Sequence, residues 1–177
     1  MRAVQHGGRR SMKGYLMTGR LGKPDHSHDT DLPRELLRVL PAQPHSLRPA
    51  RVALAEWLTL LQWPDDDADD LILAVSEAVT NVIEHAYPAT RPGLVGLHAW
   101  CGAGSTPATR RVTIAITDRG DWAREYRAID PASYHSYGLT VMSACTAEMQ
   151  IQRSASGTTV ILTSNDAPIP RHVSGRA

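Results

Sequence analysis

An acidic and an amide side chain lie four residues apart in the mostly apolar stretch from Leu71 to Tyr87. A helix would place Glu77 and Asn81 on the same face, one turn apart. At that spacing the amide oxygen could ligate a hard divalent cation, and the carboxylate could orient or deprotonate a hydroxyl group. A solvated polar stripe is the alternative for this helix taken by itself. His85, one turn further on, would more commonly pack against a neighbour or donate a structural hydrogen bond than ligate a metal.

A second carboxylate directly follows a stretch in which apolar and polar residues alternate, from Val112 to Thr117. Asp118 at the end of such a strand is a good acceptor for an exocyclic amine such as that of adenine. Gly120, two residues later, would let the backbone approach a flat base closely. The alternative is an ordinary turn, because an acid followed by glycine is typical of turns.

Two further segments have a weaker chemical signal. Gly138 stands where a loop becomes a helix, so the free backbone N–H groups at that helix start could receive phosphate oxygens. The Ser156-Gly157-Thr158 turn places a threonine hydroxyl where it could reach a base through water. An ordinary glycine turn with strand threonines is the alternative for the second segment.

The hydrophobic pattern predicts the elements that must position these residues. Apolar positions with a 3.6-residue period indicate helices, and alternating positions indicate half-buried strands. Together they predict an α+β fold, a two-layer sandwich of a mostly antiparallel sheet with helices on one face. The expected helices are residues 47–61, 65–86 and 138–146; the expected strands are 36–40, 94–100, 112–117, 149–153 and 158–163.

The ends of the chain differ in composition from its centre. Residues 1–34 are rich in Gly, His, Arg, Asp and Ser and show no apolar period, which predicts a disordered tail. Residues 166–177 contain two prolines and are expected to be a flexible tail as well. The folded domain is therefore expected to be residues 35–165.

Composition excludes several classes of function. A chain of 177 residues is long enough for one core, and a formal net charge of +1 argues against direct binding of nucleic acid. No run of eighteen apolar residues is present, so no membrane span is expected. The cytoplasm is the expected compartment.

The order and spacing of these motifs are more specific than any one of them. Together they resemble the ATP site of the GHKL family, whose fold is called the Bergerat fold. Residues 75–81 (Val-Ser-Glu-Ala-Val-Thr-Asn), followed by His85-Ala-Tyr87, are similar to the anti-sigma-factor serine kinases of that family. The upstream residues 40–46 (Leu-Pro-Ala-Gln-Pro-His-Ser) and Ala50-Arg51 are similar as well. The resemblance extends over residues 36–163.

The resemblance implies a role for the two polar residues of the long helix. Asn81 would bind the Mg²⁺ ion that bridges the ATP phosphates. Glu77 would be the catalytic general base that takes a proton from the serine of a partner protein. His85 is a possible supporting residue.

It also implies the residues around the base and the phosphates. Asp118 would accept a hydrogen bond from the adenine amino group, Gly120 would lie beside the base, and Thr158 would support the same end. Gly138 and Leu139 would close the phosphate side. Residues 121–137 would form a mobile lid over ATP, with Trp122 as a possible supporting residue.

The implied function is that of an ATP-binding anti-sigma factor and serine-protein kinase. Its partners would be a sigma factor and a STAS-domain anti-anti-sigma protein, its cofactors ATP and Mg²⁺, and a homodimer is possible. The family often has glycine at the positions of Trp122 and Ser136, and an acid at that of Ala147. These departures keep an alternative open: an ATP-responsive binding module that sequesters a sigma factor or its antagonist without transferring phosphate.

Overall fold

The described part of the chain, residues 34–122 and 136–170 of a computed structural model, is built around one antiparallel sheet. The strand order is β1-β2-β3-β5-β4, and β6 pairs with the first two residues of β3. Sheet order differs from chain order only where β5 lies between β3 and β4. The strands are β1 (Glu35–Pro41), β2 (Leu94–Ala103), β3 (Thr109–Asp118), β4 (Glu148–Ser154), β5 (Gly157–Thr163) and β6 (Ala167–Pro168).

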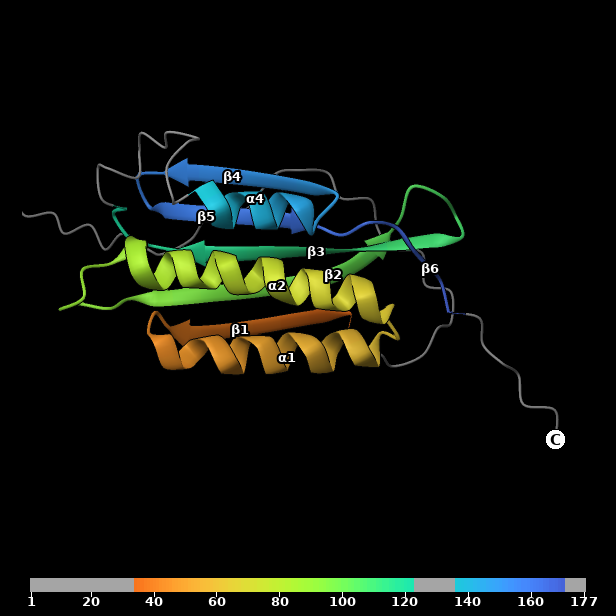
Figure 1. Ribbon diagram of the computed structural model, residues 1–177, viewed down its shortest axis with the longest axis horizontal. Helices are drawn as coiled ribbons and strands as arrows, with labels where there is room; N and C mark the ends of the chain where they lie inside the picture. Colours follow the sequence, from red (N-terminus) through yellow and green to blue (C-terminus); the bar gives the residue numbers. More distant parts are fainter. Residues whose placement is uncertain (1–33, 123–135, 171–177) are drawn as a thin grey trace, which may run out of the picture. The chain divides into compact units, whose positions relative to one another are not determined.

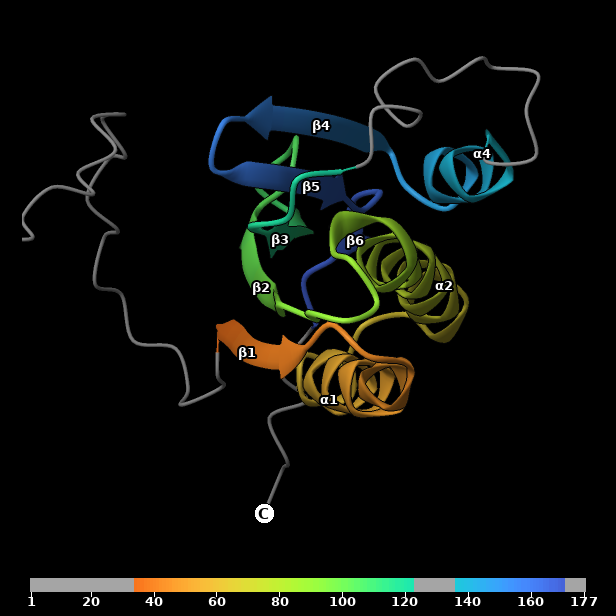
Figure 2. The same ribbon diagram turned by 90° about the vertical axis from the view of Figure 1, so that its left-hand side faces the viewer.

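Three α-helices of the described residues cover one face of this sheet (Figures 1 and 2). They are α1 (Leu47–Leu60), α2 (Asp65–Asn81) and α4 (Ser136–Ala144), and a short π-helix, η2 (Val82–Ala86), continues α2. Three aspartates occupy the first turn of α2, where the helix dipole favours negative charge. Ser46 is at the N-cap of α1, but its side chain makes no capping hydrogen bond. The layers confirm the predicted two-layer α+β fold.

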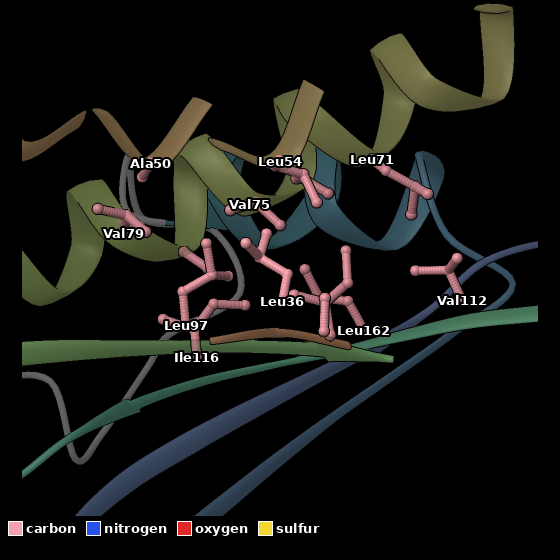
Figure 3. Close-up of a cluster of buried hydrophobic side chains, with 14 of the residues drawn as sticks. Leu36, Ala50, Leu54, Leu71, Val75, Val79, Leu97, Val112, Ile116 and Leu162 are labelled. Atoms are coloured by element: carbon pink, nitrogen blue, oxygen red, sulfur yellow. The ribbon is translucent and has the colours of Figure 1, made fainter. Parts of the chain in front are cut away.

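The core lies between the sheet and the helices (Figure 3). Alternate residues of the central strands point toward the helices, and Leu97, Ile114 and Leu162 are fully buried there. Leu54 of α1 and Val75 of α2 meet them from the other side. Burial of each large aliphatic side chain stabilises the fold by about 1.5–3 kcal/mol, so this layer holds α2 against the sheet.

The expectation of a flexible tail beyond residue 165 is wrong for residues 166–170. Ala167 is fully buried and pairs with Arg110 of β3. The carboxylate of Asp166 accepts hydrogen bonds from Ser105, Thr109 and Arg111. These bonds, the one from the Ser105 hydroxyl first, hold the pKa of Asp166 well below its usual range. Residues 1–33 and 171–177, also expected to be tails, lie outside the described residues.

No helix among the described residues has both the length and the apolar composition needed to cross a bilayer.

Candidate functional site

Glu77 and Asn81 face the beginning of α4. A Cβ atom built on Gly138 would lie 3.1 Å from Glu77 Oε2 and 3.7 Å from both Asn81 Oδ1 and Asn81 Nδ2. The structure therefore brings together three of the predicted site residues from two different helices. Any side chain at position 138 would fill the space between them. Glu77 and Asn81 are both half-buried, so they are held by the fold while remaining accessible.

The first turn of α4 adds free backbone N–H donors and a positive helix end to the site around Glu77 and Asn81. Its leading backbone N–H groups have no partner within the helix, and the helix dipole makes this end positive. Gly138 is the third residue of α4, and Leu139 packs against the core and anchors the helix there. An anion beside Glu77 and Asn81 would therefore meet a helix N-terminus, a common binding arrangement for phosphate.

The π-helix η2 connects the site around Glu77, Asn81 and Gly138 to a second site around Asp118 and Gly120. It begins directly after Asn81, and at its other end the backbone of Ala86 packs against Gly120. A Cβ on Gly120 would overlap the Ala86 carbonyl oxygen, so only glycine allows the approach. Single π-helical turns within α-helices occur frequently at functional sites. The sequence indicated helix through residue 86, but not this change of helix type.

Asp118 is a buried carboxylate at the end of β3. Its Oδ1 accepts the backbone N–H of Gly120 at 2.8 Å, and its Oδ2 accepts the indole N–H of Trp122 at 2.9 Å. The backbone N–H of Thr158 on β5 also bonds to it. Burial raises the pKa of Asp118, and these hydrogen bonds oppose that rise. A carboxylate held in this way is a directional acceptor that specifies an amine or N–H donor.

Gly157, the first residue of β5, packs against the backbone of Asp118. Its φ of 131° lies in the region that favours glycine, and a Cβ here would overlap the Asp118 carbonyl oxygen. The β4–β5 turn can therefore approach the end of β3, which places Thr158 beside Asp118.

His85 belongs to η2 and lies near Trp122, with a ring-centroid distance of 6.3 Å. Its Nε2 is also 3.5 Å from Glu84 Oε2. Thus the structure places both possible supporting residues at the Asp118 end of the site. Most of the predicted lid, residues 123–135, lies outside the described residues.

Tyr87 is a site residue that the sequence analysis did not assign. Its hydroxyl donates to the carbonyl of Leu94 at 2.8 Å and accepts the backbone N–H of Arg119 at 2.8 Å. It thereby ties the end of η2 to the turn that follows Asp118. The only sequence signal is its place two residues after His85, because Leu94 lies in the next strand and Arg119 lies 32 residues away.

Tyr87→Phe is expected to loosen that turn. Loss of the hydroxyl removes two hydrogen bonds, and we expect the free energy of unfolding to fall by about 1 kcal/mol. ATP, the ligand that the sequence resemblance implies, should also bind several-fold more weakly, because Arg119 adjoins Asp118. Thermal unfolding and calorimetric ATP titration measure the two effects, with the exposed Tyr137→Phe as a stability control. Lower stability with unchanged ATP affinity would limit Tyr87 to a structural role.

Comparison with known proteins identifies the family. The model of the histidine kinase-like ATPase domain matches residues 40–164. The serine-protein kinase RsbW of Bacillus licheniformis is 29% identical over 136 residues, which cover 70% of this chain and 80% of the relative. The anti-sigma F factor of Clostridium botulinum (strain Alaska E43 / Type E3) is 32% identical over 117 residues, which cover 66% of this chain and 70% of the relative.

A solved structure shows the same fold. The crystal structure of the RsbU and RsbW domains of a Mycobacterium tuberculosis protein is 27% identical and superposes with a TM-score of 0.55. The match covers 76% of this chain and 33% of that longer one. The chain therefore belongs to the histidine kinase-like ATPase domain family, in the branch of the serine-protein kinase RsbW and the anti-sigma F factors.

Proposed function

We propose that this protein binds ATP and transfers its terminal phosphoryl group to a serine of an anti-anti-sigma partner, and so controls a sigma factor. One observation carries the proposal. Glu77 and Asn81 of α2 lie close to Gly138, in the first turn of α4. A carboxylate, an amide and a helix N-terminus in one place can serve a proton, a cation and a phosphate.

The base of ATP is assigned to the Asp118 end of the site. Asp118 would accept the adenine amino group, Gly120 would lie beside the ring, and Thr158 would support the same edge. The hydrogen bond between Gly120 and Asp118 and the close approach to Ala86 support this assignment, because they fix the acceptor before the base arrives.

The phosphates are assigned to the first turn of α4, with Gly138 and Leu139 on that side. Asn81 would hold Mg²⁺ through its amide oxygen. A protein site for Mg²⁺ commonly supplies only one or two ligands and leaves the others to phosphates and water. The space beside Gly138 adjoins the side-chain amide of Asn81, so the residues present fit a cation that shares its coordination with phosphates. When bound, the cation would neutralise phosphate charge.

Glu77 is the proposed general base. Its carboxylate would accept the proton of the partner's serine hydroxyl as the serine oxygen forms a bond to the γ-phosphorus. The bond between that phosphorus and the β,γ-bridging oxygen would break, and ADP would leave. The half-buried position of Glu77 limits its motion, which favours a defined proton acceptor.

The relatives' names, serine-protein kinase and anti-sigma F factor, support a protein partner with a reactive serine and a sigma factor. The phosphorylated partner would be a STAS-domain protein, the sequestered one a sigma factor, and the compartment the cytoplasm. A homodimer is also proposed. The exposed Leu37 and Val39 of edge strand β1 offer an apolar surface for it, and sedimentation would show the oligomeric state.

A second candidate function is favoured by the hydrogen bond between Trp122 and Asp118. A side chain already bonded to the base-binding carboxylate would suit a module that binds ATP without turnover. That module would still hold a sigma factor or its antagonist.

Incubation of the full chain with labelled ATP, Mg²⁺ and a candidate STAS partner tests the proposal. We expect label on the partner's serine, and we expect Asn81→Ala to weaken Mg²⁺-dependent ATP binding by about 10–100-fold through loss of a ligand. Asn165→Ala, an exposed asparagine, is the matched control. ATP binding without transfer to any candidate would favour the second function. Absence of ATP binding would contradict both.

A further inference from the structure

The indole of Trp122 donates a hydrogen bond to Asp118, the carboxylate that is proposed to bind adenine. Its Nε1 lies 2.9 Å from Asp118 Oδ2, and the ring is half-buried and packs against the core. The turn that carries it is held by the hydrogen bond from Gly120 N–H to Asp118 Oδ1. The contact is therefore part of a defined turn.

The indole resembles the group that it faces in the proposed function. It is a planar fused aromatic ring that presents an N–H donor, as adenine presents its amino group. Asp118 is only 6% exposed, so a base cannot reach it without contacting the groups that cover it. A carboxylate oxygen can accept two hydrogen bonds, but Asp118 is so deeply buried that the indole and an adenine ring would compete for the exposed approach to Oδ2.

The three donors to Asp118 differ in their freedom to leave. Those of Gly120 and Thr158 are backbone N–H groups, and moving them would displace a packed turn and a strand. The donor of Trp122 is a side chain that can leave by rotation about its own torsions. Burial also disfavours the charged carboxylate, so Asp118 benefits from a donor at Oδ2 whenever the base is absent.

We propose that Trp122 takes the place of adenine in the free protein, and that its indole must leave Asp118 Oδ2 before the amino group of ATP can bond there. This inference rests on the proposed ATP site. It makes Trp122 a determinant of nucleotide affinity, because ATP selects the fraction of molecules in which the indole has moved away. The measured affinity is reduced by that fraction.

Calorimetric titration of the full chain with Mg²⁺ and ATP tests the competition. Trp122→Phe keeps an aromatic ring against the core and removes the N–H donor. We expect it to bind ATP about tenfold more tightly, since a hydrogen bond to a charged group no longer has to be broken. Trp100→Phe is the matched control, because Trp100 is half-buried on β2 at a position that points away from the helices, and it should leave the affinity unchanged.

A fluorescence titration of the unmodified chain provides a second measurement that does not require the variant to fold. Displacement of the indole should change tryptophan emission as ATP binds, both in the unmodified chain and in Trp100→Phe. Emission that stays constant at saturating ATP would overturn the inference. So would equal or weaker ATP binding by Trp122→Phe when the unmodified chain binds. If neither chain bound ATP, the proposed function would fail, and this inference with it.

Discussion

Replacing Glu77 with glutamine is expected to slow phosphoryl transfer by about 10²–10⁴-fold while ATP remains bound. Glutamine has nearly the same shape but cannot accept the proton of the attacking serine hydroxyl. The carboxylate oxygen Oε2 is the side-chain atom nearest the position of a Cβ on Gly138, at 3.1 Å, so the substitution changes the group that faces the start of α4. Single-turnover transfer to the partner and a separate ATP titration would measure the two quantities.

The control for this experiment is Glu56→Gln, the same change on the exposed surface of α1. It should leave both transfer and binding unchanged. A Glu77→Gln protein that transfers phosphate at the normal rate would remove Glu77 from the role of base. Equal losses of ATP affinity and rate would show instead that Glu77 holds the nucleotide.

The elements that carry the site were predictable because their signals are local. The aspartates before Leu71 and the apolar period after it predict α2, and the alternation before Asp118 predicts β3. Since Glu77 and Asn81 are one turn apart, a correct helix places them together without knowledge of the remaining chain. The start of α4 near Gly138 followed from the glycine at a change of pattern, although the helix begins two residues earlier, at Ser136.

The features that sequence did not reveal depend on contacts between different elements of the fold. Tyr87 bonds to Leu94 and Arg119, and nothing near residue 87 specifies those partners. The π-helical turn before it is equally a matter of packing, because its Ala86 lies against Gly120.

The ordered segment after residue 165 also depends on contacts that the local sequence does not specify. Its prolines and polar residues read as a tail because its stability comes from β3 and from the groups that bond to Asp166. A short β-pair has too weak a local pattern to be recognised. The tryptophan at position 122 is unusual for the family, but its bond to Asp118 depends on the geometry of the turn and has no local sequence signal.

Gly120→Ala is expected to disrupt both the fold near Asp118 and the proposed adenine site there. The added methyl group would lie 2.8 Å from the Cβ of Ala86 and would overlap that residue's carbonyl oxygen. The obstacle is backbone in η2, so it cannot give way as the end of a flexible side chain can. Overpacking of this kind costs typically 1–3 kcal/mol and occasionally more, and we expect about 3 kcal/mol here. In a chain of this size that corresponds to a fall of about 6–12 °C in Tm.

Binding should weaken as well as stability, because the backbone N–H of Gly120 also fixes Asp118 Oδ1. We expect ATP affinity to fall by at least about tenfold, the loss that accompanies one hydrogen bond to a charged group. Gly102→Ala is the matched control, because a Cβ on Gly102 would meet no atom within 4 Å. Thermal unfolding and ATP titration of the two variants would separate the effect of the close contact between Gly120 and Ala86 from a general effect of replacing glycine with alanine. If Gly120→Ala behaved like Gly102→Ala, the packing of that turn against η2 would not be what holds the carboxylate in place.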